Sequence, residues 1–451
     1  IEIYFTAIHT HIEKPKTNNI QFDYDHDGDL DALELNADRM KMWRNDGDGT
    51  FSDTTEKTFG NGFQISGTDA TFADFDDDGD VDLITLNNEN CFKFDNLRQG
   101  KLQPVPILTG QRTLSAIDSG DYDNNGAVDL LLVSQQMVRT YKNRGDGTFV
   151  ADRTIQSTDG TDCHFVDYDN DGFLDLWLIS PSGHSIWRND GQGKFSDQSQ
   201  ILPPLEAYGD LGQVSDFDRD GDLDLIHFPG DNDSQVLQNN GGNQNRWLQI
   251  ELEAIVEGSN KNNLKGIGSR LEIKAGNLYQ LKYVDQTISH FGLGKIDLVD
   301  VARIVWTNGV PQNVIQPQAN QKIDEKQVLK GSCPFLYVYD GNTFTFVTDL
   351  LWKSPLGMIT PIGTVASSKS ADDYVLIGDR LKEKDGHYIL KITEELWETA
   401  YFDQVKLITV DHPTGTQVWV DEKFTPVPFP PFEIHQVETA HFPISAVDCQ
   451  G

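Results

Sequence analysis

Long hydrophobic runs are missing from this 451-residue sequence. Its largest apolar runs hold about four to six residues, whereas a membrane-spanning helix needs roughly twenty. A sustained 3.6-residue hydrophobic period is also missing between residues 20 and 245. We therefore expect no membrane insertion and, in that region, no long amphipathic helices.

Basic residues are scarce as well: 36 Lys and Arg stand against 71 Asp and Glu, which gives a formal net charge of −35 at pH 7. Nucleic acids and anionic membrane surfaces are bound by basic patches, so the composition argues against both as partners. Strong acidity is also found in disordered chains, but 10% aromatic residues and many short apolar runs indicate packed cores. At this length we expect two or three domains.

Cysteine is rare, and no CxxC pair occurs. This argues against a disulfide-rich scaffold and against zinc ligation by thiolates. A single bridge between Cys333 and Cys449 and buried free thiols are both compatible with the sequence. The four cysteines are Cys91, Cys163, Cys333 and Cys449.

An acidic nonapeptide, "DYDHDGDLD" in its first copy, occurs five times. The copies begin at Asp23, Asp74, Asp121, Asp167 and Asp216, at intervals of 51, 47, 46 and 49 residues. Five copies at a nearly constant period indicate a repeat architecture, in which each unit buries its faces against its neighbours.

A second landmark, "WRNDGDGTFSD" in its first copy, follows the nonapeptide in register. Its asparagine lies 22 residues after the first aspartate in four repeats, while the second and fifth copies of the landmark are degenerate. Asn, Asp and Gly at this density predict a hairpin turn. Between the landmarks lie apolar segments of strand length, such as "VDLITL" and "LDLWLIS". Units of about 48 residues with three or four strands predict an all-β fold built from β-propeller blades.

The nonapeptides have the composition of calcium loops. Positions 1, 3 and 5 are Asp or Asn, position 9 is always Asp, and a glycine such as Gly28 makes the tight turn. Position 7 varies from Asp29 to Phe173, so only its backbone carbonyl could be a ligand in every copy. Six or seven oxygen ligands suit calcium, and five loops predict about five ions. The predicted ligands are Asp23, Asp25, Asp27, Asp31, Asp74, Asp76, Asp78, Asp82, Asp121, Asp123, Asn125, Asp129, Asp167, Asp169, Asp171, Asp175, Asp216, Asp218, Asp220 and Asp224.

Two other interpretations fit these loops less well than a calcium loop between strands. An EF-hand requires a bidentate Glu at position 12 and flanking helices, but position 12 varies from Glu34 to Leu132 to His227 and the flanks are strand-like. Acidic turns on a solvated face are the simpler alternative, and five copies with an invariant position 9 argue against it. We expect any bound calcium to be mainly structural.

The five units resemble FG-GAP/VCBS repeats, as in the integrin α-subunit propeller and many secreted bacterial proteins. The following segments "NRWLQIELEA", "NNLKGIGSRLEIKAG" and "HFGLGKIDLVDVARIVWTNG" resemble the ASPIC/UnbV domain. The combination is similar to the cartilage acidic protein family and its bacterial relatives, over about residues 20 to 330. The resemblance implies a secreted calcium-binding propeller and no catalytic residues. It also implies about seven blades, so either blades are missing here or segments outside the repeats complete the ring. Asn125, at position 5 of the third loop, departs from the pattern and suggests a weaker site.

These patterns predict three domains: propeller blades over residues 1–244, an ASPIC/UnbV-like domain over 245–330, and a β-rich C-terminal domain over 331–451 that we expect to be incomplete. The last domain shows strand-like segments separated by turns such as "YDGN" and "KDG", and one or two helical turns are expected over residues 394–401. The chain begins without Met and shows no signal peptide, so we interpret it as a piece of a longer protein.

Other motifs carry weaker expectations. Arg144-Gly145-Asp146 matches the integrin-ligand tripeptide, but a hairpin turn explains it equally well. His9 and His11, with Glu13, could place three metal-binding groups on one strand face, although solvated polar residues of an N-terminal strand are the simpler explanation. The GxSxG, P-loop and HExxH motifs are absent from the sequence.

We favour a non-enzymatic module as the interpretation of this chain. We expect it to be secreted or extracellular, or else to lie in the periplasm or at the cell surface. It would serve in adhesion or bind a protein or glycan ligand through a rigid disc. One alternative is an enzyme acting on carbohydrate or a small molecule at the propeller face, which a polar pocket with a carboxylate outside the five loops would favour. The other is a subunit of an extracellular assembly, in which strands of the last domain pair between chains.

Overall fold

The protein forms two compact units, residues 1–328 and 329–451, in the computed structural model. The three-domain division at residues 244/245 and 330/331 stays a prediction. Among the described residues, no helix is long and apolar enough to cross a membrane. The described residues are 3–9, 12, 19–98, 100–110, 113–134, 137–155, 159–181, 183–204, 211–228, 234–255, 262–328, 334–350, 374–393, 402–420 and 433–439.

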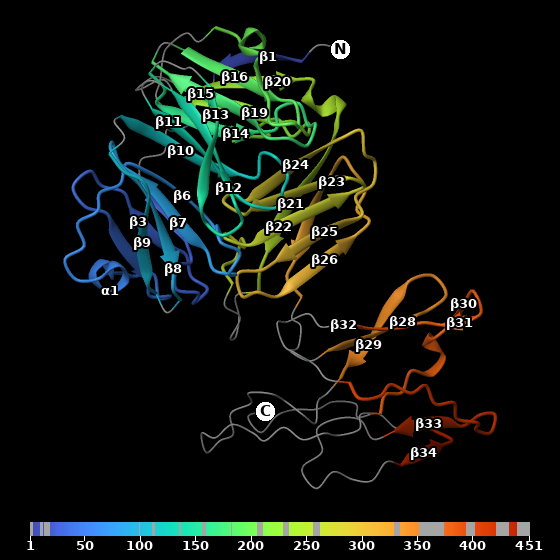
Figure 1. Ribbon diagram of the computed structural model, residues 1–451. Coiled ribbons are helices and arrows are strands. Elements are labelled where there is room, and N and C mark those ends of the chain that lie inside the picture. The colour runs from blue at the N-terminus through green and yellow to red at the C-terminus, as the bar shows by residue number, and fades with distance from the viewer. Residues whose placement is uncertain are drawn as a thin grey trace. The chain divides into compact units, whose positions relative to one another are not determined.

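Within its described residues, the repeat region of the first unit (residues 1–244) contains five four-stranded antiparallel sheets that follow one another in chain order (Figure 1). We call them blades 1 to 5. The all-β fold with propeller-like blades is therefore confirmed. Blade 1 contains β2 (Asn19–Phe22), β3 (Asp31–Glu34), β4 (Lys41–Asn45) and β5 (Phe51–Asp53); blade 2 contains β6 (Asp69–Ala73), β7 (Asp82–Leu86), β8 (Cys91–Asn96) and β9 (Leu102–Leu108); blade 3 contains β10 (Leu114–Gly120), β11 (Asp129–Ser134), β12 (Val138–Asn143) and β13 (Phe149–Ile155); blade 4 contains β14 (Asp162–Val166), β15 (Asp175–Ser180), β16 (Gly183–Asn189) and β17 (Phe195–Asp197); blade 5 contains β18 (Leu211–Ser215), β19 (Asp224–Phe228), β20 (Gln235–Asn240) and β1 (Tyr4–His9).

Blade 5 is completed by a strand from outside the repeats. Strand β1 pairs antiparallel with β20, from Tyr4 opposite Asn240 to His9 opposite Gln235. A segment outside the repeats thus supplies the fourth strand of this blade, whereas the completion of a ring by such segments stays a prediction. Short helical turns lie between strands of the first unit: α1 (Thr55–Phe59), η1 (Ser199–Ile201) and η2 (Gly242–Gln244).

Apolar side chains fill the spaces between consecutive blades. Phe22 and Met42 of blade 1 share a buried cluster with Leu83 of blade 2. Leu131 of blade 3 shares another cluster with Leu176 of blade 4. The second strands of blades 2 to 5 are buried along nearly their whole length, which explains why their sequences are nearly continuous apolar runs. Full burial of each such side chain contributes roughly 1.5–3 kcal/mol.

The face of blade 5 that points away from blade 4 is packed differently from the corresponding faces of blades 1 to 4. The aromatic residue at position 2 of the nonapeptide is buried where another blade follows: Tyr24 is 1% exposed, Phe75 1%, Tyr122 0% and Tyr168 3%. Its counterpart in blade 5, Phe217, is 45% exposed. Each of blades 1 to 4 is closely packed against the next blade in the chain. The corresponding face of blade 5, which we call its forward face, lacks such packing at Phe217.

Residues 245–328, which we call the ASPIC domain, form two further sheets in the first unit. The three-stranded sheet has the order β24-β21-β27, with β21 and β27 parallel, and the four-stranded sheet has the order β23-β22-β25-β26. Leu248, Ile273, Phe291 and Trp306 belong to one buried cluster between these sheets. The strands are β21 (Arg246–Glu253), β22 (Arg270–Ala275), β23 (Leu278–Tyr283), β24 (Ile288–Gly294), β25 (Val301–Val305), β26 (Pro311–Ile315) and β27 (Gln321–Lys326).

The described part of the second unit is also mostly β. The predicted strand–turn–strand around Asp340-Gly341 is present as β28 and β29, which join β32 in a three-stranded sheet. The helical turns expected at residues 394–401 lie outside the described residues. The elements are β28 (Phe335–Tyr339), β29 (Phe344–Asp349), η3 (Gly378–Arg380), β30 (Glu383–Lys384), β31 (His387–Tyr388), β32 (Leu390–Thr393), β33 (Gln417–Val420) and β34 (Ile434–Val437).

Candidate metal centres

Each nonapeptide forms the turn between the first and second strands of its blade, and all five turns share one backbone shape. We number the turns loops 1 to 5 and their residues positions 1 to 9. The glycine at position 6 is left-handed as predicted, with φ of 96° at Gly28. Position 4 is left-handed too, although no glycine stands there; Asn170 has φ 54°. Four of the five position 4 residues are His, Asp or Asn, of which Asp and Asn tolerate this conformation best. The Asp and Asn residues at position 4 are the feature of the sequence from which this left-handed turn could have been predicted. The position 4 residues are His26, Asp77, Asn124, Asn170 and Arg219.

The aspartate at position 1 holds each turn closed. In loop 1, the backbone N–H groups of Asp27 and Gly28 donate to the two carboxylate oxygens of Asp23, at 3.1 and 3.0 Å. The corresponding pair of bonds is present in the other four loops. The carboxylate at position 5 likewise accepts the N–H of position 7, for example Asp29 to Asp27 at 3.1 Å. The loop backbone therefore turns these carboxylates toward a common centre.

The second sequence landmark connects the blades at these loops. In blade 4, the N–H of Asn189 donates to Asp175 at position 9 (2.6 Å), and its side-chain amide donates to Leu174 O (3.1 Å) and to Tyr122 O of blade 3 (2.8 Å). Blades 2, 3 and 5 make the same cross-blade bond. In blade 5 it comes from Asn239, 23 rather than 22 residues after Asp216, so the copy judged degenerate keeps this asparagine one residue later.

Position 3 meets a cationic side chain in four loops. In loop 1, Arg44 Nε donates to Asp25 Oδ2 at 2.9 Å and Arg44 reaches Asp27 as well. Arg188 plays this part in loop 4, Lys93 in loop 2 and Lys142 in loop 3. In loop 5 the neutral amide of Gln238 donates to Asp218 instead. Sequence reasoning missed these partners because they come from the third strand of the blade.

In three loops, the second carboxylate oxygen of the position 3 aspartate has no hydrogen-bond partner. Oδ1 of Asp25, Asp76 and Asp123 is buried and has no hydrogen-bond partner. A buried oxygen without a donor is costly unless a cation takes its place. In loops 1 to 4, sets of three predicted ligands have carboxylate oxygens within 4.8 Å of one another. The residues present therefore fit a hard metal ion. These sets are Asp23, Asp25 and Asp27; Asp74, Asp76 and Asp78; Asp121, Asp123 and Asp129; and Asp167, Asp169 and Asp175.

Burial and mutual repulsion make the metal-free carboxylates weak acids. Burial raises the pKa of Asp23 to about 7, and the neighbouring carboxylates of Asp25 and Asp27 add to the effect. Burial likewise raises the pKa of Asp31 and Asp82 to about 8. A divalent cation would favour the ionised forms and reverse these shifts.

The remaining ligand positions lie in the same loops. Position 9 is buried in every loop, and its Oδ1 accepts the landmark asparagine N–H. Asn125 in loop 3 accepts the N–H of Ala127 (2.8 Å), just as Asp27 accepts that of Asp29. Loop 5 is the most exposed of the five, and Asp218 and Asp220 are solvent-exposed. All twenty predicted ligands thus lie at their expected positions; their coordination of a metal stays a prediction.

The weaker motifs have structural explanations or lie outside the described residues. Asp146 of the Arg-Gly-Asp tripeptide accepts the N–H and hydroxyl of Thr148, and Asp48 does the same for Thr50 in blade 1. The tripeptide is therefore an ordinary hairpin turn of this repeat. His11, Glu13, Cys333 and Cys449 lie outside the described residues, so neither the histidine site nor the predicted bridge can be placed. Cys91 and Cys163 are buried free thiols.

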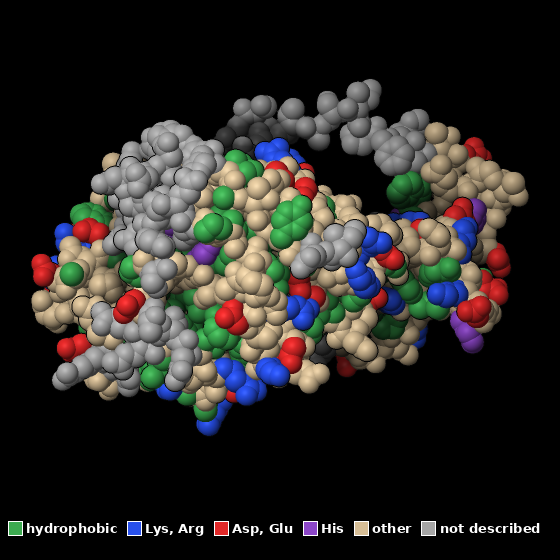
Figure 2. Space-filling view, turned by 90° about the horizontal axis from the view of Figure 1, so that it is seen from above, with side chains coloured by type: hydrophobic (Ala, Val, Ile, Leu, Met, Phe, Trp, Pro, Cys, Tyr) green, Lys and Arg blue, Asp and Glu red, His purple; other side chains and the backbone are tan. Residues whose placement is uncertain are grey.

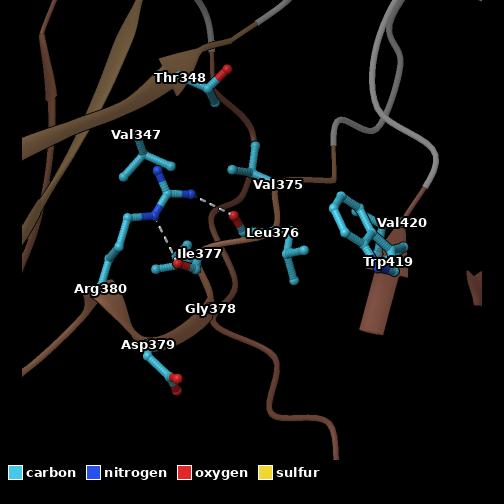
Figure 3. A pocket seen from close by; sticks show the side chains of 10 residues that line it. All are labelled: Val347, Thr348, Val375, Leu376, Ile377, Gly378, Asp379, Arg380, Trp419 and Val420. Carbon is cyan, nitrogen blue, oxygen red and sulfur yellow. Dashed lines mark hydrogen bonds between the residues drawn. The ribbon is translucent and has the colours of Figure 1, made fainter. Parts of the chain in front are cut away.

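A cavity of about 640 Å³ lies in the second unit, between the 375–380 segment and strand β33 (Figure 3). Val347 and Thr348 line one side and Trp419 another. The guanidinium of Arg380 donates to Ile377 O (3.0 Å) and Leu376 O (2.8 Å). Since Arg380 is committed to backbone carbonyls, the cavity offers no evident anion site.

Comparisons with known proteins agree with this architecture. A model of the FG-GAP-like repeat matches residues 23–85, 121–178 and 167–227, and a model of the ASPIC and UnbV domain matches residues 258–328. The chain is thus a propeller-type protein of FG-GAP-like repeats followed by an ASPIC and UnbV domain, as the sequence predicted.

Its curated relatives include cartilage acidic protein 1. The human protein is 24% identical over 299 residues, which cover 63% of this chain and 40% of that protein. The Xenopus tropicalis protein is 23% identical over 340 residues, which cover 68% and 43%. The chain therefore spans about 40% of the length of the curated relatives it matches.

Similar solved structures include an Agrocybe aegerita lectin that recognises non-reducing terminal N-acetylglucosamine. It is 18% identical with a TM-score of 0.37, over 67% of this chain and 80% of that one. The Vibrio cholerae biofilm matrix protein Bap1 is 12% identical with a TM-score of 0.32, over 96% of this chain and 70% of that one.

Proposed function

We propose that this chain is a calcium-binding, non-enzymatic propeller module that acts outside the cell in adhesion or in binding a protein or glycan. Calcium is mainly structural, with one ion in each of the five loops. The observation that carries the proposal is the set of buried, bare oxygens at position 3, which face other carboxylates in the same loop. Relatedness to cartilage acidic protein 1 supports the extracellular setting.

The ligands would be the side chains at positions 1, 3, 5 and 9, together with the carbonyl of position 7. Calcium is the expected ion because carboxylate and carbonyl oxygens in a flexible set of six or seven suit it better than magnesium. A bound ion would neutralise the carboxylates beside the bonds that connect consecutive blades, such as Asn189 to Tyr122 O. Metal binding would therefore stabilise the contacts between blades as well as each loop.

The composition of the surface supports the choice of partner. On the face drawn in Figure 2, Lys and Arg are interspersed with Asp and Glu. An overall charge of −35 also disfavours nucleic acid and anionic lipid surfaces. The ASPIC domain contacts loops 2 to 5, so we expect a large partner to bind elsewhere on the propeller.

A polar pocket with a carboxylate outside the five loops would favour the enzyme alternative. Such carboxylates exist on the first strands of blades 2 to 4, but each accepts a backbone N–H from the next blade. The pairs are Asp69 with Ile117 (2.9 Å), Asp118 with Phe165 (2.7 Å) and Asp162 with Gly212 (2.8 Å). These bonds connect neighbouring strands around the propeller, which explains the carboxylates without catalysis.

Measurements of metal content, stability and ligand binding test the proposal. Elemental analysis of protein dialysed against calcium should find close to five calcium ions per chain, and EGTA should lower the melting temperature. One ion or none under saturating calcium would overturn the loop assignment. A glycan array and a panel of purified matrix proteins, each probed with and without calcium, should identify the partner class; turnover of an arrayed glycan would support the enzyme instead.

A further inference from the structure

The ASPIC domain docks on the calcium loops themselves. Its polar contacts reach loops 2, 4 and 5, and its apolar side chains cover loop 3. Loop 1 makes no such contact among the described residues. The contacts are Arg270 with Asp77 in loop 2 (2.5 Å), Tyr279 over Gly126 in loop 3, His290 with Asn170 in loop 4 (2.6 Å) and Gln249 with Asp216 in loop 5 (2.7 Å).

The contacts at loops 4 and 5 form a continuous hydrogen-bonded path. Gln249 Nε2 donates to Oδ2 of Asp216, the predicted position 1 ligand, and lies 3.3 Å from His290 Nδ1. Burial lowers the pKa of His290 to about 3, so the neutral ring can accept at Nδ1 and donate from Nε2 to Asn170 Oδ1. Asn170 Nδ2 in turn donates to Gly221 O of loop 5 (2.8 Å). The ASPIC domain therefore bridges two neighbouring loops.

Close backbone packing reinforces this path. A Cβ added to Gly292 of β24 would lie 2.1 Å from Asp167 Oδ2, the position 1 oxygen of loop 4. At Gly221 of loop 5, an added Cβ would lie 2.0 Å from the indole nitrogen of Trp247. The apolar side chain of Leu281 is only 4% exposed, in a cluster with Phe75 and Val128 beside loops 2 and 3. Such contacts tolerate only small changes in loop shape.

We propose that calcium in loop 4 fixes the surface on which the ASPIC domain docks, so that metal binding and docking strengthen each other. The inference rests on the proposed function. A bound ion would hold the position 1 carboxylate of Asp167 in the place where the close approach of Gly292 leaves no room for movement. Coupling of this kind is reciprocal, since whatever metal binding adds to docking, docking adds to metal affinity. Loop 1, which the ASPIC domain leaves uncovered, would bind its ion without this coupling.

Hydrogen exchange of the full chain tests the first direction. With calcium present, backbone amides in 246–253 and 288–294 should be protected, and EGTA should speed their exchange at least several-fold. Peptides from 301–315, inside the ASPIC sheets, should change little. Asp167→Asn should reproduce the effect of EGTA, whereas the matched control Asp23→Asn in loop 1 should not. Equal effects of the two variants would overturn the inference.

Calcium titration of Gly292→Ala tests the reverse direction. The substitution alters no predicted ligand, but its methyl group collides with loop 4. We expect the loop 4 site to weaken by roughly 5- to 150-fold, the range usual for coupled sites, with the remaining sites unchanged. Unchanged affinity at every site, or EGTA that removes calcium without altering exchange, would refute the coupling and leave the proposed function intact. A chain that binds no calcium would refute both.

Discussion

At the scale of single residues, the asparagine of the second landmark has the clearest role. Its chemistry explains the fixed spacing from the nonapeptide: one amide side chain serves the loop of its own blade and a carbonyl of the preceding blade. The sequence shows the spacing, but the partner carbonyl lies about 70 residues away and cannot be read locally.

Replacing Asn189 should therefore weaken the contact between blades 3 and 4. Asn189→Ala leaves two buried carbonyls, Tyr122 O and Leu174 O, without a donor, which should cost about 1–3 kcal/mol of unfolding free energy. Asn45→Ala is the matched control, because among the described residues the amide of Asn45 donates to Leu30 O alone, at 3.3 Å. Calorimetry in saturating calcium should show a larger fall in melting temperature for Asn189→Ala; equal falls would contradict this role.

Asn125 offers a gain-of-affinity test. Asn125→Asp gives loop 3 the carboxylate that the other loops have at position 5, and an added negative ligand should tighten calcium binding there. We expect one site to gain affinity in a calorimetric titration. Asn88→Asp adds the same charge in the exposed turn between β7 and β8, at the opposite end of blade 2. A comparable gain from this control would show that the change in overall charge, and not ligation, is responsible.

At the scale of elements, the loops could be predicted further than their surroundings. The acidic positions, the glycine turn and the strand flanks are local features, so composition and spacing were enough to predict the turn; the role of the acidic residues as ligands stays a prediction. The left-handed position 4 and the cationic side chains such as Arg44 were not predicted, because their roles depend on packing between strands. The contacts of Gln249 and His290 with the loops could not be predicted from local patterns at all, because these residues belong to a different sheet.

The loops also predict how stability depends on pH. The pKa of Asp23 is raised to about 7 and that of Asp31 to about 8, above the 3.8 of a free side chain. Between about pH 4 and 8 the folded metal-free chain therefore binds more protons than the unfolded chain, and this contribution to stability is lost as the pH rises. In EGTA, the melting temperature should fall from pH 5.5 to pH 8.

Calcium should reverse this trend. Metal binding requires ionised carboxylates, so the increase in melting temperature caused by calcium should grow over the same pH interval. Differential scanning calorimetry with and without calcium at four or five pH values measures both effects. A melting temperature that rises with pH in EGTA would show that the loop carboxylates are not buried together in the metal-free protein.

At the scale of the whole molecule, the forward faces of the five blades are not equally packed. Phe75 is covered by the next blade, whereas Phe217 at the same loop position is 45% exposed. Phe75→Ala should cost about 3–5 kcal/mol of unfolding free energy, as for other buried aromatic residues, and Phe217→Ala well under 1 kcal/mol. The repeats could not predict this difference, because both residues occupy the same position of the same motif. A large loss of stability in Phe217→Ala would mean that the forward face of blade 5 is closely packed, contrary to this prediction.

The pairing of β1 with β20 has a consequence for how the molecule is made. These strands are joined by contacts between residues up to 236 apart, such as Asn240 with Tyr4 O. Sequence-distant pairing of this kind is slow to form. During synthesis, β1 emerges more than two hundred residues before its partner strand β20. A nascent chain should therefore depend on protection of this early strand against aggregation.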